Sequence, residues 1–415
     1  MTAGRGRHHA AFLELAPLLP AVIWTGLLAG RGRYWSTKPR LPAQSLRDAP
    51  AGGHWPPVTV IVPARDEAAL LPRTLPSLLA QDYPGTARVV LVDDMSTDGT
   101  GAVAAALGGP VPLEAKGARR DPGTGTRVEL TVVQGGPRPQ GWAGKPWAMA
   151  QGAEQALLQQ PRPEWLLFTD ADIVHPPSSL RQLVSAALAD QRAAVSLMAR
   201  LHTGTAWEEL LVPAFVYFFA QIYPFNWVND RHRRTAAAAG GCLLVRASAL
   251  EAAGGIRTLA GSTIDDVALA KALKAAGSDI WLGLAGGSAP NVESVRTYPR
   301  LSDIWDMVAR SAYTQLRHNP LALAGTVAGL CATYLAPPVL AVGGLATRRP
   351  LMATAGLLAW GTMAATYMPL ARYYSASPAT AAALSFTASL YTAMTVSSAL
   401  RYYQGRVAWK GRQLD

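Results

Sequence analysis

Hydrophobic and polar positions alternate regularly through the middle of the chain. Short runs rich in Val, Leu and Ile are separated by stretches in which apolar residues recur at helical spacing. The runs predicted as strands are 58–64, 87–94, 127–134, 164–172 and 193–199. The stretches predicted as helices between them are 70–81, 145–160 and 178–190. This alternation predicts an α/β fold with a mostly parallel sheet covered by helices on both faces.

Longer apolar stretches lie at both ends of the chain. Residues 10–30 are long enough to cross a bilayer, and we expect them to form a retained anchor. A secretory signal peptide is the alternative, but its apolar core would be shorter and no clear cleavage site precedes Arg31. Three more stretches that are long enough to span predict a C-terminal transmembrane region, and they are 321–346, 351–371 and 379–400.

The orientation of these segments follows in part from their flanking charges. More Lys and Arg follow the first stretch than precede it, which predicts that the chain from residue 31 onward is cytoplasmic. Three C-terminal crossings would place the basic tail from Arg401 outside, whereas a re-entrant turn at Pro337 and Pro338 would return it to the cytoplasm. Residues 210–225 are apolar nearly all round but short, so they form either an interfacial segment or a buried core helix.

We therefore expect three domains. They are an anchor with its juxtamembrane segment (1–50), a cytoplasmic catalytic domain (51–318) with an interfacial segment (207–230), and a C-terminal transmembrane region (319–415). Half of the 415 residues are hydrophobic and 16% are charged. That charged fraction is below the roughly 25% of soluble domains, in keeping with membrane-embedded stretches.

The distribution of charge excludes one class of function. Residues 1–50 carry +5 and residues 347–415 carry +6, which accounts for the whole net charge of +11. The excess therefore flanks apolar segments and forms no stripe for a phosphate backbone, so we expect no nucleic-acid partner. Cys242 and Cys331 are the only cysteines, which excludes a disulfide framework and a four-cysteine zinc site.

Acidic residues follow several of the predicted strands, at the sheet edge where ligands bind in open α/β folds. The first strand leads into Pro63–Glu67 without a glycine, and Gly144-Lys145 is followed by proline, so neither glycine-rich phosphate loop is present. Asp170 and Asp172 follow a buried strand and offer oxygen ligands suited to Mg²⁺ or Mn²⁺. A turn or helix cap is the alternative for such a pair alone.

Two further acidic pairs have catalytic or binding interpretations. Asp93 and Asp94 end a strand, where a fixed carboxylate can accept a hydrogen bond from a pyrimidine N3–H, and we favour this over capping. For Asp98 we favour capping of the helix that follows. Asp265 and Asp266 begin a helix and are either partners of its dipole or, in a pocket, a general base.

Together and in this order, these sites resemble the family 2 glycosyltransferases of the GT-A fold. The matching segments are VPARDE (62–67), VDDMSTDGT (92–100), GWAGKPWA (141–148), TDAD (169–172), AAGGCLLVRASAL (238–250) and IDDVALAKAL (264–273). Longer matches narrow the resemblance to the hopene-associated group and lie at 210–230, 234–246, 280–284 and 303–327. The resemblance covers residues 10–340.

This resemblance implies a role for each residue of the site. The implied donor-binding residues are Pro63, Arg65, Glu67, Asp93, Asp94, Lys145, Asp170, Arg310, Gln315 and Arg317. The implied ligands of Mg²⁺ or Mn²⁺ are Asp170 and Asp172, and the implied base is Asp266, beside Asp265, which stands where Glu is commoner. Gly240 and Gly241 would lie on the acceptor side. For Lys145 a solvated lysine at a helix start is an equal alternative.

The resemblance also implies the reaction. We expect inverting, metal-dependent transfer from a nucleotide sugar, with a UDP-sugar as the expected donor, to a membrane lipid such as a hopanoid or polyprenoid. Ser311 stands where the family has Trp after the basic position of Arg310, which disfavours a processive role. The expected location is the bacterial inner membrane, multi-pass, with the catalytic domain facing the cytoplasm. A catalytically silent membrane scaffold of this fold and nucleotidyl transfer to a lipid are the alternatives.

Overall fold

The computed structural model describes residues 15–41, 53–108, 128–262, 264–286, 291–406, 408–409 and 412–413. The chain divides into two compact units. The helical unit comprises Met1–Thr37, Thr203–Pro224 and Tyr298–Asp415, and the sheet unit comprises Lys38–His202 and Phe225–Thr297. This division differs from the expected catalytic domain of residues 51–318, because 203–224 and 298–318 belong to the helical unit.

The sheet unit is built on a seven-stranded sheet in the order β3-β2-β1-β4-β7-β6-β8. Its strands are β1 (Val58–Ala64), β2 (Ala87–Asp93), β3 (Glu129–Gln134), β4 (Trp165–Phe168), β6 (Ala194–Met198), β7 (Leu243–Arg246) and β8 (Ile280–Leu284). Only β7 runs antiparallel to its neighbours, β4 and β6. The predicted mostly parallel α/β sheet is therefore confirmed.

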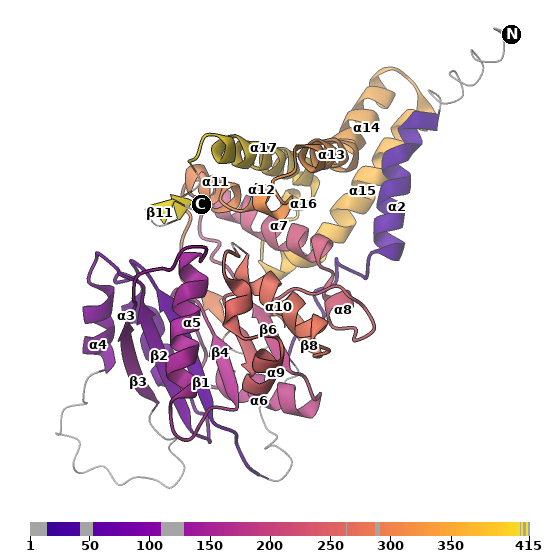
Figure 1. Cartoon of the computed structure of the whole chain (residues 1–415). Helices are drawn as coiled ribbons and strands as arrows, with labels where there is room; N and C mark the ends of the chain where they lie inside the picture. The colour runs from indigo at the N-terminus through magenta and orange to yellow at the C-terminus, as the bar shows by residue number, and fades with distance from the viewer. Residues whose placement is uncertain are drawn as a thin grey trace, which may run out of the picture. The chain divides into compact units, whose positions relative to one another are not determined.

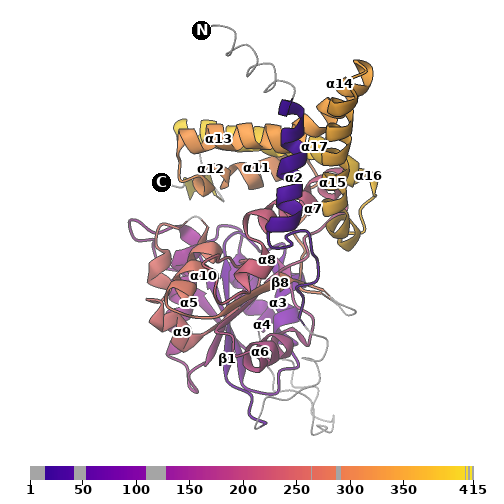
Figure 2. The ribbon, with the colours of Figure 1, turned by 90° about the vertical axis from the view of Figure 1, so that its right-hand side faces the viewer.

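Helices cover both faces of this sheet. Figure 2 shows α5, α9 and α10 on one side of the strands and α3, α4 and α6 on the other. Their bounds are α3 (Leu71–Leu79), α4 (Thr100–Gly108), α5 (Gly144–Leu157), α6 (Ser179–Ala189), α9 (Ala247–Ala252) and α10 (Asp265–Ala275). Four consecutive β2 residues, Val89–Val92, are 0% exposed, as expected for a strand with both faces covered. Each such side chain stabilises the fold by about 1.5–3 kcal/mol.

Smaller elements complete the sheet unit. They are the short helix α8 (Phe225–Val228), the 3-10 helix η4 (Ile256–Leu259) and a two-stranded ribbon of β5 (Ile173–Val174) and β9 (Glu293–Ser294). The predicted strand 164–172 ends early as β4 at Phe168, so that Asp170 and Asp172 lie in the turn between β4 and β5. This turn connects the sheet to the ribbon.

The helical unit gathers helices from three separate parts of the chain (Figure 1). They are α2 (Leu19–Gly30), α7 (Ala206–Ile222), α11 (Leu301–Ala309), α12 (Ala312–Gln315), α13 (Pro320–Leu330), α14 (Ala336–Ala346), α15 (Pro350–Tyr373), α16 (Ala379–Ala382) and α17 (Leu384–Tyr403), with η1 (Ala16–Leu18), a π-helical turn η5 (Cys331–Leu335) and the strands β10 (Ala408–Trp409) and β11 (Arg412–Gln413). Leu211, Val212 and Val216 of α7 are 0% exposed, so this helix forms the core of the unit.

One helical run of this unit bends near Pro337 and Pro338, the two prolines at which the sequence offers a re-entrant turn. From Pro320 to Ala346 the chain stays helical through α13, η5 and α14, and the figures show α13 and α14 at a steep angle. Pro337 has no N–H to donate to the carbonyl of Thr333. The indole Nε1 of Trp24 donates to that oxygen instead, at 2.7 Å. The π-helical turn and the proline therefore account for the bend, and α2 stabilises it.

Among the described residues, this run of 27 residues is the one helix long and apolar enough to cross a membrane, judged by length and composition. α15 and α17 have sufficient length but are less apolar, and the described apolar part of the predicted anchor, Ala16–Gly30, is shorter. Residues 10–14 of that anchor lie outside the described residues. Among the described residues one candidate span is therefore present, whereas the sequence predicts four.

Candidate active site

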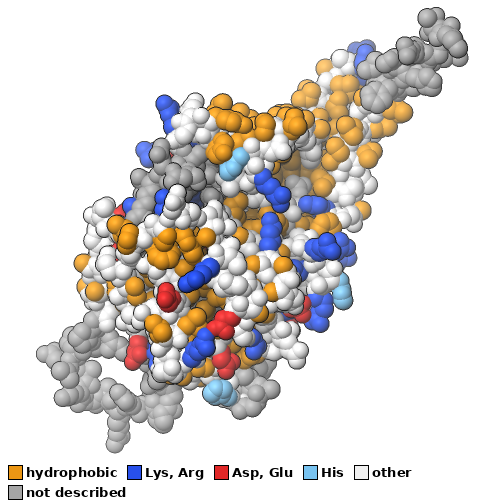
Figure 3. All heavy atoms as spheres, viewed as in Figure 1, with side chains coloured by type: hydrophobic (Ala, Val, Ile, Leu, Met, Phe, Trp, Pro, Cys, Tyr) orange, Lys and Arg blue, Asp and Glu red, His pale blue; other side chains and the backbone are white. Residues whose placement is uncertain are grey.

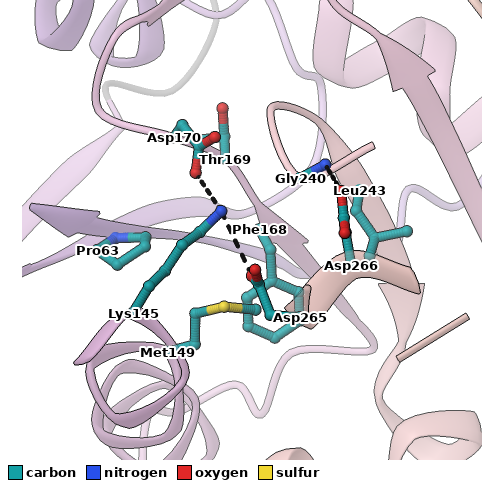
Figure 4. Close-up of a pocket in the computed structure, with 10 residues that line it drawn as sticks. All are labelled: Pro63, Lys145, Met149, Phe168, Thr169, Asp170, Gly240, Leu243, Asp265 and Asp266. Carbon is teal, nitrogen blue, oxygen red and sulfur yellow. Dashed lines mark hydrogen bonds and ion pairs between the residues drawn. The ribbon is translucent and has the colours of Figure 1, made fainter. Parts of the chain in front are cut away.

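A pocket lined by both charged and apolar side chains lies at the carboxyl ends of the central strands (Figure 4). β1 contributes Pro63, the end of β4 contributes Phe168–Asp170, and the first turns of α5 and α10 contribute Lys145 with Asp265 and Asp266. The remaining lining residues are Met149, Gly240 and Leu243. Six of the predicted site residues are thereby brought into one pocket: Pro63, Lys145, Asp170, Gly240, Asp265 and Asp266.

Lys145 occupies the centre of this pocket. Its Nζ lies 2.6 Å from Asp170 Oδ1 and 3.3 Å from Asp265 Oδ2, and 24% of its side chain is exposed. Burial opposes the charged form of Lys145, but the charges of Asp170 and Asp265 outweigh it and hold its pKa above the ordinary value. Lys145 is therefore an ion-paired residue of the pocket, and the alternative of a solvated lysine is wrong.

The pKa of Asp266 is raised, which is the direction that suits a general base. Burial and the adjacent charge of Asp265 raise the pKa of Asp266 to about 7, although Lys145 partly opposes the rise. Its Oδ2 accepts a hydrogen bond from the backbone N–H of Gly240 at 2.8 Å. A carboxylate with a pKa near neutrality can take a proton from a hydroxyl more readily than an ordinary aspartate.

Gly240 can approach these groups because it has no side chain. A Cβ at this position would lie 2.9 Å from Lys145 Nζ and 3.5 Å from Asp266 Oδ2. The first distance is shorter than a van der Waals contact, so any larger residue would displace the Lys145 ammonium. The close packing of the pocket therefore favours glycine at position 240.

His175, a buried histidine that no sequence motif indicated, contacts Thr169 in the lining of the pocket. The hydroxyl of Thr169 donates to Gly241 O at 2.7 Å and lies 2.8 Å from His175 Nε2, while His175 Nδ1 lies 3.1 Å from Ser179 Oγ. Since the Thr169 proton goes to Gly241, we assign the His175 proton to Nε2. Burial lowers the pKa of His175 to about 4, so the ring is neutral. A single histidine in a turn gave no sequence signal of this role.

Asp172 lies beside the pocket and is held by Arg296, a second residue that the sequence analysis did not single out. Arg296 Nε donates to Asp172 Oδ2 at 2.9 Å, and its Nη2 lies 2.6 Å from Glu67 Oε1. Ser294 Oγ also donates to Asp172 Oδ2, at 3.0 Å. Arg296 is 124 positions from Asp172 in the sequence, so only the fold brings the pair together.

The two predicted metal ligands fit a divalent ion in part. Among the described residues, no group of three or more His, Cys, Asp and Glu side chains is arranged to hold a metal. Asp170 and Asp172 nevertheless supply hard carboxylate oxygens on one short turn. Such a donor set suits Mg²⁺ or Mn²⁺ when phosphate oxygens and water complete the coordination.

The residues that end β1 and β2 are fixed by contacts with each other. Arg65 Nη1 donates to Asp94 O at 2.7 Å, and Asp93 Oδ1 accepts from the backbone N–H of Ser96 at 3.0 Å. Asp93 and Asp94 are both buried. Asp98 Oδ1 accepts from the N–H of Thr100 at 3.0 Å, so its predicted capping role is confirmed. The donor-pocket roles of Arg65, Asp93 and Asp94 stay predictions.

The remaining predicted residues belong to the helical unit. They are Arg310, Gln315 and Arg317. Gln315 Nε2 donates to the hydroxyl of Tyr223 within that unit. Their predicted contacts with the leaving diphosphate stay predictions.

Comparisons with known proteins identify the family of the sheet unit. A family profile described as "Glycosyltransferase like family 2" matches residues 56–297. No curated protein matches the chain. A mannosyltransferase from Pyrobaculum calidifontis, solved with GDP-Man and Mn²⁺, is 21% identical with a TM-score of 0.49, and the alignment covers 94% of this chain and 99% of that one. S. aureus TarS in complex with UDP-GlcNAc is 14% identical with a TM-score of 0.38, covering 84% and 92%.

A third solved structure is similar over a shorter region. The mannosyl-3-phosphoglycerate synthase from Rubrobacter xylanophilus is 17% identical with a TM-score of 0.36, and the alignment covers 63% of this chain and 75% of that one. All three TM-scores lie below 0.5, so the family assignment depends on the profile, which matches more than half of the chain. The chain is a glycosyltransferase and belongs to the family described as glycosyltransferase like family 2.

Proposed function

We propose that this enzyme transfers a sugar, with inversion at the anomeric carbon, from a nucleotide sugar to the hydroxyl of a membrane lipid. The observation that carries the proposal is Asp266, a carboxylate with its pKa raised to about 7 at the edge of a pocket that also contains Lys145 and Asp170. A scaffold without catalysis has no physical need for such an arrangement, because buried like charges destabilise the fold.

The residues of the pocket divide the reaction between them. Asp266 takes the proton of the acceptor hydroxyl, whose oxygen attacks the anomeric carbon. The bond from that carbon to the diphosphate breaks, and its electron pair leaves with the nucleoside diphosphate. Mg²⁺ or Mn²⁺, when bound at Asp170 and Asp172, supplies positive charge that stabilises the departing diphosphate. The ammonium of Lys145 lies 2.6 Å from Asp170 and offsets carboxylate charge near the same position.

A lipid acceptor is supported by the apolar surface of the helical unit. Figure 3 shows hydrophobic side chains gathered over α13, α14 and α2. Large hydrophobic residues are exposed on α2 (Leu19, Val22 and Leu28), α14 (Val339, Val342 and Leu345) and α15 (Leu357 and Leu358). Exposed apolar patches of this extent mark membrane or protein interaction surfaces. We propose a multi-pass protein of the bacterial inner membrane, with the sheet unit cytoplasmic, a UDP-sugar donor and a hopanoid or polyprenoid acceptor.

Membranes that contain the enzyme test this proposal directly. They are incubated with a panel of nucleotide sugars and Mg²⁺ or Mn²⁺, and the extracted lipids are analysed by mass spectrometry. We expect a new lipid with the mass of one added sugar, and its loss in Asp266→Asn, because an amide cannot accept the hydroxyl proton. Asp82→Asn is the matched control, since Asp82 pairs with Arg181 outside the pocket. Full transfer by Asp266→Asn would contradict the assignment of Asp266 as the general base. A sugar product found only in the water phase would contradict a lipid acceptor.

A further inference from the structure

Arg296 occupies carboxylates that the proposed function assigns to the metal ion and the donor. Its guanidinium bridges Asp172 Oδ2, at 2.9 Å, and Glu67 Oε1, at 2.6 Å. Only 14% of the Asp172 side chain and 9% of the Glu67 side chain are exposed, so salt and water weaken these two ion pairs less than they weaken surface pairs. The bridge therefore neutralises one buried acid, Glu67, and one partly buried acid, Asp172, at once.

The backbone around this bridge is fixed, whereas the guanidinium is partly accessible. β5 and β9 pair with Ile173 opposite Ser294, and the N–H of Val295 donates to Asp172 O at 2.9 Å. Asp172 and Arg296 are thus held in register by the ribbon. Arg296 lies two residues beyond the end of β9 and its side chain is 29% exposed, so a rotation of the guanidinium breaks none of the β5–β9 pairing.

A metal ion that binds Asp172 meets the guanidinium of Arg296, which already donates to Oδ2 of that carboxylate. Arginine keeps its positive charge at all ordinary pH values, so Asp172 cannot be vacated by loss of a proton from Arg296. A divalent cation that takes Oδ2 of Asp172 as a ligand therefore displaces an existing charge-assisted hydrogen bond, which weakens the binding of the metal alone. A diphosphate offers Arg296 a new anionic partner, since guanidinium groups bind phosphate oxygens in a bidentate manner.

Resting on the proposed function, we propose that Arg296 is a positioning residue that occupies the metal site of the unloaded enzyme and couples metal binding to donor binding. The metal ion displaces Arg296 from Asp172, and the freed guanidinium turns to the donor diphosphate. The metal alone binds weakly, and the nucleoside diphosphate tightens its binding. By linkage the metal tightens diphosphate binding by the same factor.

Metal titration of the purified full chain tests this coupling without any transfer reaction. Mn²⁺ binding is measured by electron paramagnetic resonance, alone and with UDP or GDP, for the wild type and Arg296→Gln. We expect Arg296→Gln to bind Mn²⁺ alone about tenfold more tightly than the wild type, and the tightening by the diphosphate to shrink by a similar factor. Arg162→Gln is the matched control and leaves both values unchanged, because Arg162 is 57% exposed and pairs with Glu251 away from the pocket.

Further variants keep the test decisive if Arg296→Gln does not fold. Arg296→Met also removes the guanidinium while keeping the apolar stem, so it should tighten the binding of Mn²⁺ alone by a similar factor. Arg296→Lys keeps the charge and should stay close to the wild type. Unchanged or weaker Mn²⁺ binding in folded Arg296→Gln, or in Arg296→Met when the former is unfolded, overturns the inference. Absence of Mn²⁺ binding to the wild type with either diphosphate would instead contradict the metal site of the proposed function.

Discussion

At the scale of single residues, the protonation of Asp266 connects the activity of the enzyme with its stability. Burial and Asp265 raise its pKa from 3.8 to about 7, so Asp266 is ionised, and able to act as a base, only above that range. We expect kcat/KM to fall as the pH is lowered through about 7, as measured by initial rates between pH 5.5 and 9. A profile that is flat over this interval would contradict the assignment of Asp266 as the base.

The same raised pKa fixes the sign of a stability effect. Because the folded state binds the proton more tightly than the unfolded state, stability falls as the pH rises from about 4 through about 7. Asp266→Asn lacks this loss, and its amide oxygen can still accept from Gly240. The variant should therefore melt at a higher temperature than the wild type at pH 8, with a smaller difference at pH 4.5. This increase, together with lost transfer, separates a catalytic defect from misfolding.

Gly240 carries the second prediction at this scale. In Gly240→Ala the new Cβ would lie 2.9 Å from Lys145 Nζ, so the ammonium at the end of this flexible side chain must shift within the pocket. Because a misplacement of about 1 Å can cost about 10²-fold in rate, we expect this smaller shift to lower transfer by about tenfold or less, measured at saturating donor. Gly136→Ala is the control, since its Cβ would meet Gln151 Oε1 at an ordinary 3.5 Å. Equal rates for the two variants would show that the pocket does not depend on this close approach.

At the scale of elements, the sequence was informative where a segment carries its own pattern. The five strands and three helices predicted in the sheet unit are all present, because their Val-, Leu- and Ile-rich runs are long enough to show a period. β7 has only four residues and follows Ala236–Ala239, a run with the highest helix propensity. That run is a buried segment without regular secondary structure instead, held by Ser196 Oγ, which accepts from the N–H of Ala239 and donates to Cys242 O.

In the candidate site, too, the sequence indicated only those residues that stand in a motif. Three acids that stand in motifs after strands or at helix starts, Asp170, Asp265 and Asp266, lie in one pocket of the structure, at the sheet edge where ligands bind in α/β folds. Arg296 and His175 were not identified, because neither stands in a motif. Their partners are fixed by the ribbon of β5 and β9 and by the turn after β4, which are tertiary features.

At the scale of the whole molecule, the apolar exposure of the helical unit leads to the last prediction. If α13 and α14 lie in a bilayer, the protein stays with membranes washed in alkaline carbonate and is released by detergent. Val339 and Val342 on α14 are 66% and 61% exposed, so replacing both with Asp creates no clash inside the unit. Each charge near the centre of a membrane helix costs about 2.5–3.5 kcal/mol, so the double variant should be retained far less. Leu158→Asp is the control, because Leu158 is 72% exposed at the end of α5 in the sheet unit. Complete release of the wild type by carbonate would contradict insertion of α13 and α14 into the bilayer. It would also remove the observation that supports a lipid acceptor.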